Sequence, residues 1–355
     1  MPGRPMSQDQ YPHRVARVRS LVAGEQDGAL VEELVDLAVH NEDVWRYDGA
    51  AVRMAVEVLP PSRRHALILA VADRAAAGAP PVEVSSLLRW LARGLGPAAL
   101  SWRAGRCLID TTAASVTGLP DELRVLAEVA VRETGAVPPE LLAVIRRSAM
   151  RFSDWATALQ PWLDTAADPL NVGEAWAGTA NAEVADRPLL VHALAAKGAH
   201  PAAGWARRAA AVAGELGAAR CRTLIHRWFD LVPRPRTLRL RDDDRYDANE
   251  VLDPHNALAL RGLLFLLTTV PPDPEDPAVV GRLAQHAAEK GPGHGPRSKV
   301  VAYAAVHTLE RLGTVPALHE LQRLRSGTNQ PGFSGRLDVA IARRRAALRT
   351  SALIA

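Results

Sequence analysis

Lysine and cysteine are scarce in this 355-residue chain. Lysine occurs only at Lys197, Lys290 and Lys299, so nearly all of the 43 Lys and Arg residues are arginines. With abundant Ala, Gly and Pro, this bias is typical of a GC-rich genome, and the formal charge of +4 is weak support for a polyanionic partner. Cys107 and Cys221 lie far apart with no thiol near either one, which excludes a cysteine-based zinc site and disfavours a disulfide framework.

Long hydrophobic runs are missing as well. The N-terminal stretch MPGRPMSQDQYP lacks the apolar core of a secretory signal. The longest apolar run, residues 257–270, is interrupted by Arg261 and is shorter than the ~20 residues that a membrane span needs. We therefore expect a soluble, cytoplasmic protein with no membrane contact.

Sheet signals are also missing. Only residues 236–241 alternate between apolar and polar side chains, and one short strand cannot form a sheet. Elsewhere apolar residues recur every three or four positions, as in ALVEELVDLAVH and ELRVLAEVAVRETG, which is the spacing of an amphipathic helix. The sequence predicts an all-α protein.

Glycine and proline interrupt these helices at fairly even intervals. Helices joined by short loops pack antiparallel, and one pair with its turns would occupy about 40 residues, the size of a HEAT or armadillo unit. No consensus sequence recurs, so any repeat is one of structure and not of sequence. We predict a HEAT/armadillo-like helical-repeat solenoid built from antiparallel helix pairs.

Composition divides the chain into four parts. We expect a disordered tail over residues 1–12, a helical-repeat region over 13–231, a polar connector over 232–253, and a C-terminal helical module over 254–355 that continues the solenoid. The connector carries four arginines followed by a run of aspartates. The helix after it is apolar on nearly every side, so it should be buried.

The C-terminal module resembles a known family. NALALRGLLF, then GPGHGPRSK, then AAVHTLERLG is similar to the C-terminal part of the bacterial molybdate-metabolism-regulator-like, WGR-associated proteins of unknown function. The resemblance covers about the last hundred residues and implies a helical-repeat protein with no settled activity; Trp-Gly-Arg itself is absent from this sequence. Lys299 falls one residue early for the family spacing. The matching residues are Asn256, Gly262, Gly293, Gly295, Pro296 and Arg297.

The turn over residues 291–299 differs from a phosphate-binding loop, because Pro292 and Pro296 have no N–H to offer a phosphate. Pro296 suits the first position of a helix, which would place Arg297 and Lys299 in its first turn. Cations there oppose the helix dipole by about 0.3–1 kcal/mol each. A negative group is therefore expected nearby, either a protein carboxylate or a bound anion.

Arg261 is the second cation that needs a partner, because an unpaired buried charge costs several kcal/mol. We expect a structural salt bridge, with a bound anion shared with the turn as the alternative. The resemblance adds Asn256 to the candidate residues, and His294 lies within the turn. The candidate site for an anion or a partner is thus Arg261, Arg297, Lys299, Asn256 and His294.

Signatures of catalysis and of metal binding are absent. The acidic run DDDRYD lacks the glycine and the distant glutamate of a calcium loop. None of the 11 histidines occurs in an H-E-x-x-H motif, and G-x-S-x-G is missing. The sequence predicts no metal, no cofactor and no catalytic residue.

Three functions remain open. The first is a non-catalytic scaffold for a protein partner, because a solenoid presents a long surface. The second is a nucleic-acid-binding repeat that uses Arg-rich faces such as residues 336–349, which would otherwise form a solvated end cap. The third is an anion- or nucleotide-binding enzyme at the corner formed by Arg261 and Arg297.

Overall fold

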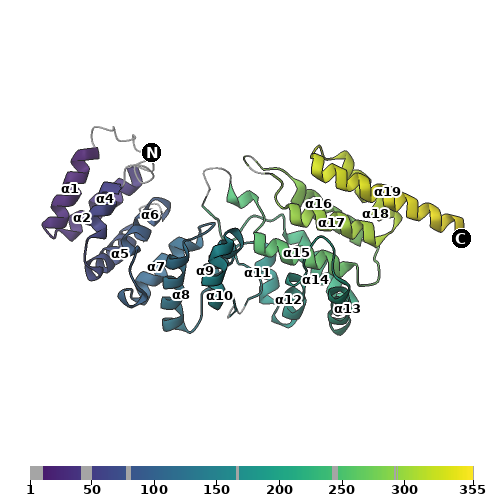
Figure 1. Ribbon diagram of the computed structural model, residues 1–355, viewed down its shortest axis with the longest axis horizontal. Coiled ribbons are helices and arrows are strands. Elements are labelled where there is room, and N and C mark those ends of the chain that lie inside the picture. The colour runs from purple at the N-terminus through teal and green to yellow at the C-terminus, as the bar shows by residue number, and fades with distance from the viewer. Residues whose placement is uncertain are drawn as a thin grey trace. The chain divides into compact units, whose positions relative to one another are not determined.

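The structure is a computed structural model that describes residues 11–40, 50–76, 81–164, 168–241, 247–291, 293 and 295–354. This described part contains eighteen α-helices, three short 3₁₀ helices and no strand, which confirms the all-α prediction (Figure 1). The chain divides into two compact units, residues 1–164 and 165–355, which we call unit 1 and unit 2. Residues 1–10 of the predicted tail lie outside the described residues, and the first helix begins at Tyr11.

Unit 1 has its own hydrophobic core, built mainly from leucine and valine. Its 3₁₀ helix η2 spans Pro97–Ala99. Its α-helices are α1 (Tyr11–Ala23), α2 (Asp27–His40), α4 (Ala50–Glu57), α5 (Pro61–Ala76), α6 (Pro81–Ala92), α7 (Trp102–Ala113), α8 (Pro120–Thr134), α9 (Pro139–Arg151) and α10 (Ser153–Asp164).

Unit 2 has a second core, which includes the fully buried Trp176, Trp228 and Phe265. Two 3₁₀ helices, η3 (Val184–Asp186) and η4 (Ala248–Glu250), lie between its α-helices. The α-helices are α11 (Ala175–Ala182), α12 (Arg187–Leu194), α13 (Ala203–Leu216), α14 (Ala218–Leu231), α15 (Pro254–Leu267), α16 (Asp276–Ala288), α17 (Lys299–Leu312), α18 (Val315–Ser326) and α19 (Pro331–Ile354).

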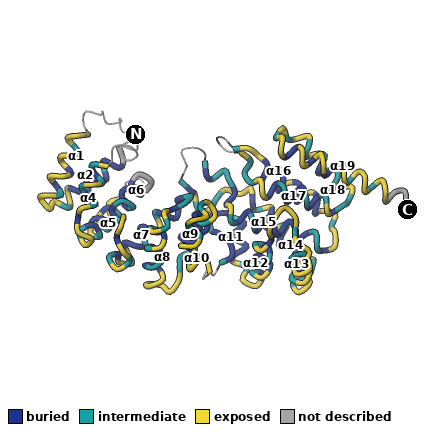
Figure 2. The backbone as a smooth tube through the Cα atoms, in the orientation of Figure 1, coloured by how far each residue is buried: buried dark blue, intermediate teal, exposed yellow. Residues whose placement is uncertain are grey.

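Local sequence signals account for many helix ends. Helices α8 and α9 begin at Pro120 and Pro139, followed in the first turn by two acidic residues in α8 and one in α9, as the sequence predicts. Helix α8 ends at Gly135, whose φ of 76° is a left-handed conformation that glycine adopts without strain. Most helices turn a buried side toward their neighbours and an exposed side outward (Figure 2).

Helix α15 is the central helix of unit 2. Ten of its residues are buried, as its apolar sequence predicts, and it contacts α12, α13 and α17. Its Gly262 allows a very close approach to α12, because a Cβ atom at this position would lie 2.0 Å from the carbonyl oxygen of Ala193. The glycine is therefore required by packing.

The start of α17 differs from the prediction. Pro296 does not open the helix; it forms an isolated antiparallel bridge with Lys290. Ser298 is the N-cap, and its hydroxyl accepts a hydrogen bond from the backbone N–H of Val301. A serine oxygen can satisfy an N–H at a helix start, whereas Gly295 has no side chain to do so, and the helix therefore begins at Lys299.

The predicted polar connector lies inside unit 2. Its residues 242–246, which include most of the aspartate run, fall outside the described residues. The described remainder contains the short helix η4, where the Asp247 carboxylate accepts a hydrogen bond from the N–H of Asn249. The Asn249 side chain in turn bonds both backbone groups of Leu240, so the two described ends of the connector are held together.

The two cysteines should differ in reactivity. Burial raises the pKa of the Cys221 thiol to about 11, which leaves about 0.1% thiolate at pH 8, and burial also raises the pKa of the less buried Cys107. We expect iodoacetamide to label Cys107 slowly in the native protein and Cys221 only after denaturation, as read by peptide mass spectrometry. Equal labelling of both in the native state would contradict this burial.

Candidate functional site

Arg297 lies between two carboxylates. Its guanidinium donates to the backbone carbonyl of Glu250 at 2.9 Å and pairs with the Glu250 side chain, while its Nε lies 3.4 Å from a carboxylate oxygen of Glu289. The Arg297 backbone N–H also donates to the Glu289 carbonyl at 2.9 Å. The negative group expected beside this turn is therefore supplied by the protein, and Arg297 fastens the turn to η4 and to the end of α16.

Lys299 and His294 are the other candidates from the turn. Lys299 is the first residue of α17 and is exposed. His294 lies outside the described residues. Among the described residues of the turn, Arg297 is therefore paired with carboxylates, and Lys299 is exposed.

Arg261 has a different partner from the one predicted. Its Nη2 donates to the backbone carbonyl of Ala196, just beyond α12, and its Nε is buried without a hydrogen-bond partner among the described residues. Burial lowers the pKa of this guanidinium. The expected salt bridge is wrong for the described part of the chain, because the end of α12 offers a carbonyl at the point where the side chain leaves the core.

Asn256 belongs to a buried polar network at the start of α15, and we call it the Asn256 network. The Asn256 side-chain oxygen accepts from the N–H of Asn171 at 2.8 Å, and its amide donates to the Asn171 carbonyl at 3.0 Å and to Glu174 at 2.9 Å. All three residues are buried. Asn256 therefore joins α15 to the segment before α11 by satisfying polar groups that water cannot reach.

Glu174 is the centre of the Asn256 network. Its carboxylate accepts hydrogen bonds from the Trp176 indole N–H at 3.0 Å and from the backbone N–H of Asp253 at 2.7 Å. Arg236, whose side chain is also buried, lies 3.6 Å away. Burial raises the pKa of Glu174, and the positive charge of Arg236 opposes that shift. The geometry ascribes a structural role to this network, because each polar contact joins segments of unit 2.

The sequence candidates therefore do not converge on one site. Arg297 contacts η4 and α16, Arg261 contacts the end of α12, and Asn256 contacts the segment before α11. These partners are all different. An anion held jointly by Arg261 and Arg297 has no support in the contacts that either guanidinium makes.

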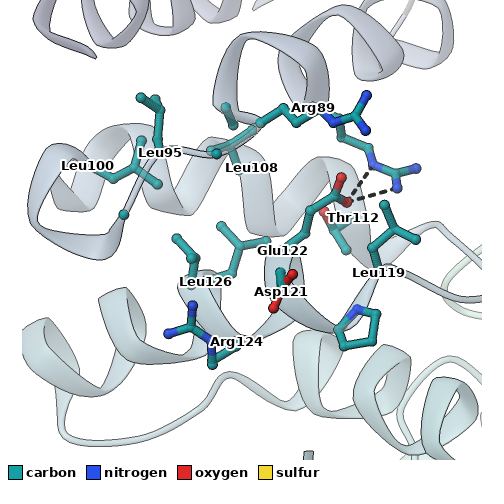
Figure 3. Close-up of a pocket in the computed structure, with 16 residues that line it drawn as sticks. Arg89, Leu95, Leu100, Leu108, Thr112, Leu119, Asp121, Glu122, Arg124 and Leu126 are labelled. Carbon is teal, nitrogen blue, oxygen red and sulfur yellow. Dashed lines mark hydrogen bonds and ion pairs between the residues drawn. The ribbon is translucent and has the colours of Figure 1, made fainter. Parts of the chain in front are cut away.

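Unit 1 contains a cavity that the sequence did not single out. It has a volume of about 560 Å³ and lies between the end of α6, the loop before η2, α7 and the start of α8. Four buried leucines line it: Leu95, Leu100, Leu108 and Leu126 (Figure 3). Its size is within the range of ligand-binding clefts, and we call it the leucine pocket.

Charged residues surround the leucine pocket. Arg89 pairs with Glu122 through a 2.9 Å contact, while Asp121 and Arg124 lie on the same helix start as Glu122 (Figure 3). Leu119, the residue before α8, lines the pocket and is 47% exposed. An apolar interior with a polar rim can bury an apolar group and orient it through hydrogen bonds.

The walls of the leucine pocket are held by an arginine side chain and by a glycine turn. Arg132 of α8 donates to the carbonyls of Pro97 and Leu100, both at 2.9 Å, which ties η2 to α8. Gly94 has a φ of 71°, a left-handed conformation that turns the chain at the end of α6. The breakers around residues 94–97 and 118–120 were visible in the sequence, but only the fold shows that these two turns border one cavity.

Three of the five arginines on the last helix contact other groups of the protein. Arg343 of α19 lies 3.5 Å from Glu310, Arg344 donates to the Gly313 carbonyl, and Arg336 stacks on the ring of Tyr303. Similar pairs cross between neighbouring helices elsewhere in both units. Arg345 and Arg349 of the same helix are exposed, so the nucleic-acid alternative stays a prediction.

One Ser–His pair also lies in unit 1. The Ser101 hydroxyl is 2.8 Å from His65 Nε2 and accepts from the N–H of Ala104 as the N-cap of α7. No described carboxylate forms a hydrogen bond with His65. The pair is explained as a helix cap that joins α5 to α7, since a nucleophile–base pair needs a group that orients the base.

Neither protein-family models, nor curated proteins, nor solved structures gave a match to this chain. Among the described residues, no helix is long and apolar enough to cross a membrane. The same residues contain no cluster of three or more His, Cys, Asp or Glu side chains that would hold a metal ion. The resemblance to the molybdate-metabolism-regulator-like family stays a prediction.

Proposed function

We propose that this chain is a helical-repeat binding scaffold whose leucine pocket takes an apolar segment of a protein partner. The observation that carries the proposal is the pocket itself, which combines a volume of about 560 Å³ with leucine walls and an Arg–Glu rim. Interfaces gain most of their free energy where one partner inserts an apolar anchor into such a pocket.

The order of helix packing supports a repeat architecture within each unit. In unit 1, α7 contacts α8 and α9, and α8 contacts α9 and α10; in unit 2, α16 contacts α17 and α18, and α17 contacts α18 and α19. Contacts between helices one or two places apart are typical of stacked helix pairs. A HEAT- or armadillo-like assembly is therefore the architecture that we propose, with a cytoplasmic location.

The rim favours a partner segment that carries both an apolar anchor and polar groups. Arg89 and Glu122 are each about one-third exposed or less, so their charge pair is partly shielded from solvent. A partner that brings a hydrogen-bond donor or acceptor to this pair would be oriented by it. A purely apolar ligand would leave the pair without a new contact.

Leu119→Arg is the variant that tests the proposal. It places a charge at the mouth of the pocket, where burial against a partner would be costly, while an exposed position tolerates the change with a stability loss of about 0.5 kcal/mol or less. We expect a partner captured from the native host by the wild-type chain to be lost, with at least a tenfold drop in recovery by quantitative mass spectrometry.

Val184→Arg is the matched control. Val184 is 61% exposed on η3 in unit 2, so the control adds the same charge to an exposed aliphatic position that does not line the leucine pocket. We expect it to retain every partner of the wild-type chain. Equal recovery of the partner with Leu119→Arg and Val184→Arg would show that the pocket is not the binding site.

A further inference from the structure

In unit 2, two histidines that are distant in the sequence lie with their ring nitrogens close together. His200 lies in the loop between α12 and α13 and is exposed, whereas His307 lies on α17 and is partly buried. Their Nδ1 atoms are 3.1 Å apart, although 107 positions separate the two residues in the sequence. The Asn256 network and the leucine pocket do not include this pair.

The separation suits two ligands of one metal ion. Two imidazole nitrogens that bind zinc at about 2.0–2.1 Å, with an angle between about 90° and 109°, lie about 2.9–3.4 Å apart. The observed Nδ1–Nδ1 distance of 3.1 Å falls inside this range. The loop and α17 thus hold the two nitrogens at the spacing that coordination would require.

The orientation of the rings excludes a straight hydrogen bond. A linear N–H···N bond of this length would place the ring centroids about 5.4 Å apart, since each centroid lies about 1.15 Å behind its nitrogen. At an N–N distance of 3.1 Å, rings that share one metal ion would have centroids about 4.8 Å apart. The observed separation is 4.5 Å with planes inclined by 55°, which is closer to the value for two rings that share a metal ion than to the value for a straight hydrogen bond.

The position of His307 is fixed by packing. Phe265 of α15 meets the His307 ring edge to face, with centroids 5.5 Å apart, and Trp205 packs against Phe265 in the same manner. Burial, together with the nearby charges of His200 and Arg311, lowers the pKa of His307 to about 4.

We propose that His200 and His307 bind a divalent transition-metal ion through their Nδ1 atoms. Because His200 is exposed, water would fill the remaining coordination positions. Imidazole ligands favour copper, nickel and zinc over magnesium and calcium, which prefer oxygen. The site is independent of the proposed scaffold function, since it lies in unit 2 and uses neither the leucine pocket nor its rim.

The test is calorimetric titration of the tag-free full chain at pH 7.5 with Cu²⁺, Ni²⁺, Zn²⁺ and Mg²⁺. We expect one ion per chain, an affinity highest for Cu²⁺, and no binding of Mg²⁺. His200→Ala and His307→Phe should each weaken Zn²⁺ binding at least tenfold, and in the electron paramagnetic resonance spectrum of bound Cu²⁺ each should remove the hyperfine splitting of one coordinated nitrogen. Because His200 is exposed, H200A tests the site even where H307F destabilises the core.

Two further variants serve as a control and as a test of a nearby charge. His319→Ala removes an exposed histidine on α18 and should leave the affinity for Zn²⁺ unchanged. Arg311→Gln removes an exposed cation one turn after His307 and should tighten binding about two- to fivefold. Absence of binding to wild type, or binding that survives undiminished in both H200A and H307F, would overturn the proposal.

Discussion

Gly262→Ala should lower the free energy of unfolding of unit 2 by about 3 kcal/mol or more. A Cβ atom at this position would lie 2.0 Å from the Ala193 carbonyl oxygen and 2.5 Å from its carbonyl carbon. Both are backbone atoms, so no side-chain rotation can relieve the clash. Helices α12 and α15 would have to move apart, which would loosen the most buried helix of the unit. Urea unfolding followed by circular dichroism measures the loss.

Gly178→Ala is the matched control for this substitution. Gly178 is exposed within α11, and a Cβ atom there would meet nothing within 4 Å. Alanine in an exposed helix interior is favoured over glycine by about 0.5–1 kcal/mol, so the control should be slightly more stable than wild type. Similar destabilisation by both substitutions would show that the α12–α15 contact is looser than described.

The helices could be predicted from the sequence because their signals are local. Apolar spacing, a proline with acids at the start of α8, and Gly135 at its end act within one turn of the chain. The start of α17 was misplaced because two local signals competed there. Pro296 favours a helix start, but the Ser298 hydroxyl caps the helix two residues later, and Pro296 instead pairs with Lys290.

The partners of the candidate residues could not be predicted, because they depend on contacts between distant segments. The sequence showed that both cations need partners, Arg261 because of the cost of a buried charge and Arg297 because a cation at a helix start opposes the dipole. It could not show that Arg261 meets the Ala196 carbonyl, 65 positions away, or that Arg297 meets Glu250, 47 positions away. Such pairings follow from the packing order of helices, which periodicity does not specify.

Both proposed sites also depend on contacts between segments that are distant in the sequence. The leucine pocket combines turns about 25 residues apart on either side of α7, and the His200–His307 pair joins a loop to a helix 107 positions away. Each residue alone has an ordinary explanation as a core leucine or a partly buried histidine. Only their arrangement in the fold gives them a shared chemistry, which is why single-residue reasoning favoured Arg261 and the turn over residues 291–299 instead.

Asn256→Asp should lower the free energy of unfolding by about 3–5 kcal/mol at pH 7. The change preserves the shape of the side chain but removes the amide donors to the Asn171 carbonyl and to Glu174. It also introduces a carboxylate beside the buried Glu174, whose own pKa is raised by burial. Thermal and urea unfolding measure the loss, with Asn329→Asp at an exposed position as the control that should match wild type.

The loss in the free energy of unfolding caused by Asn256→Asp should become smaller as the pH is lowered. The introduced carboxyl group is buried in the folded state, so its pKa there is raised above the value of about 3.9 in the unfolded chain. A raised acid pKa destabilises the fold increasingly as the pH rises above the unfolded value, and the difference from wild type should therefore narrow as the pH falls from 7 toward 4. Protonation also returns one donor to the site. A deficit that stays constant over this range would show that the loss comes from shape or packing, and that the Asn256 network does not hold α15 in the way described.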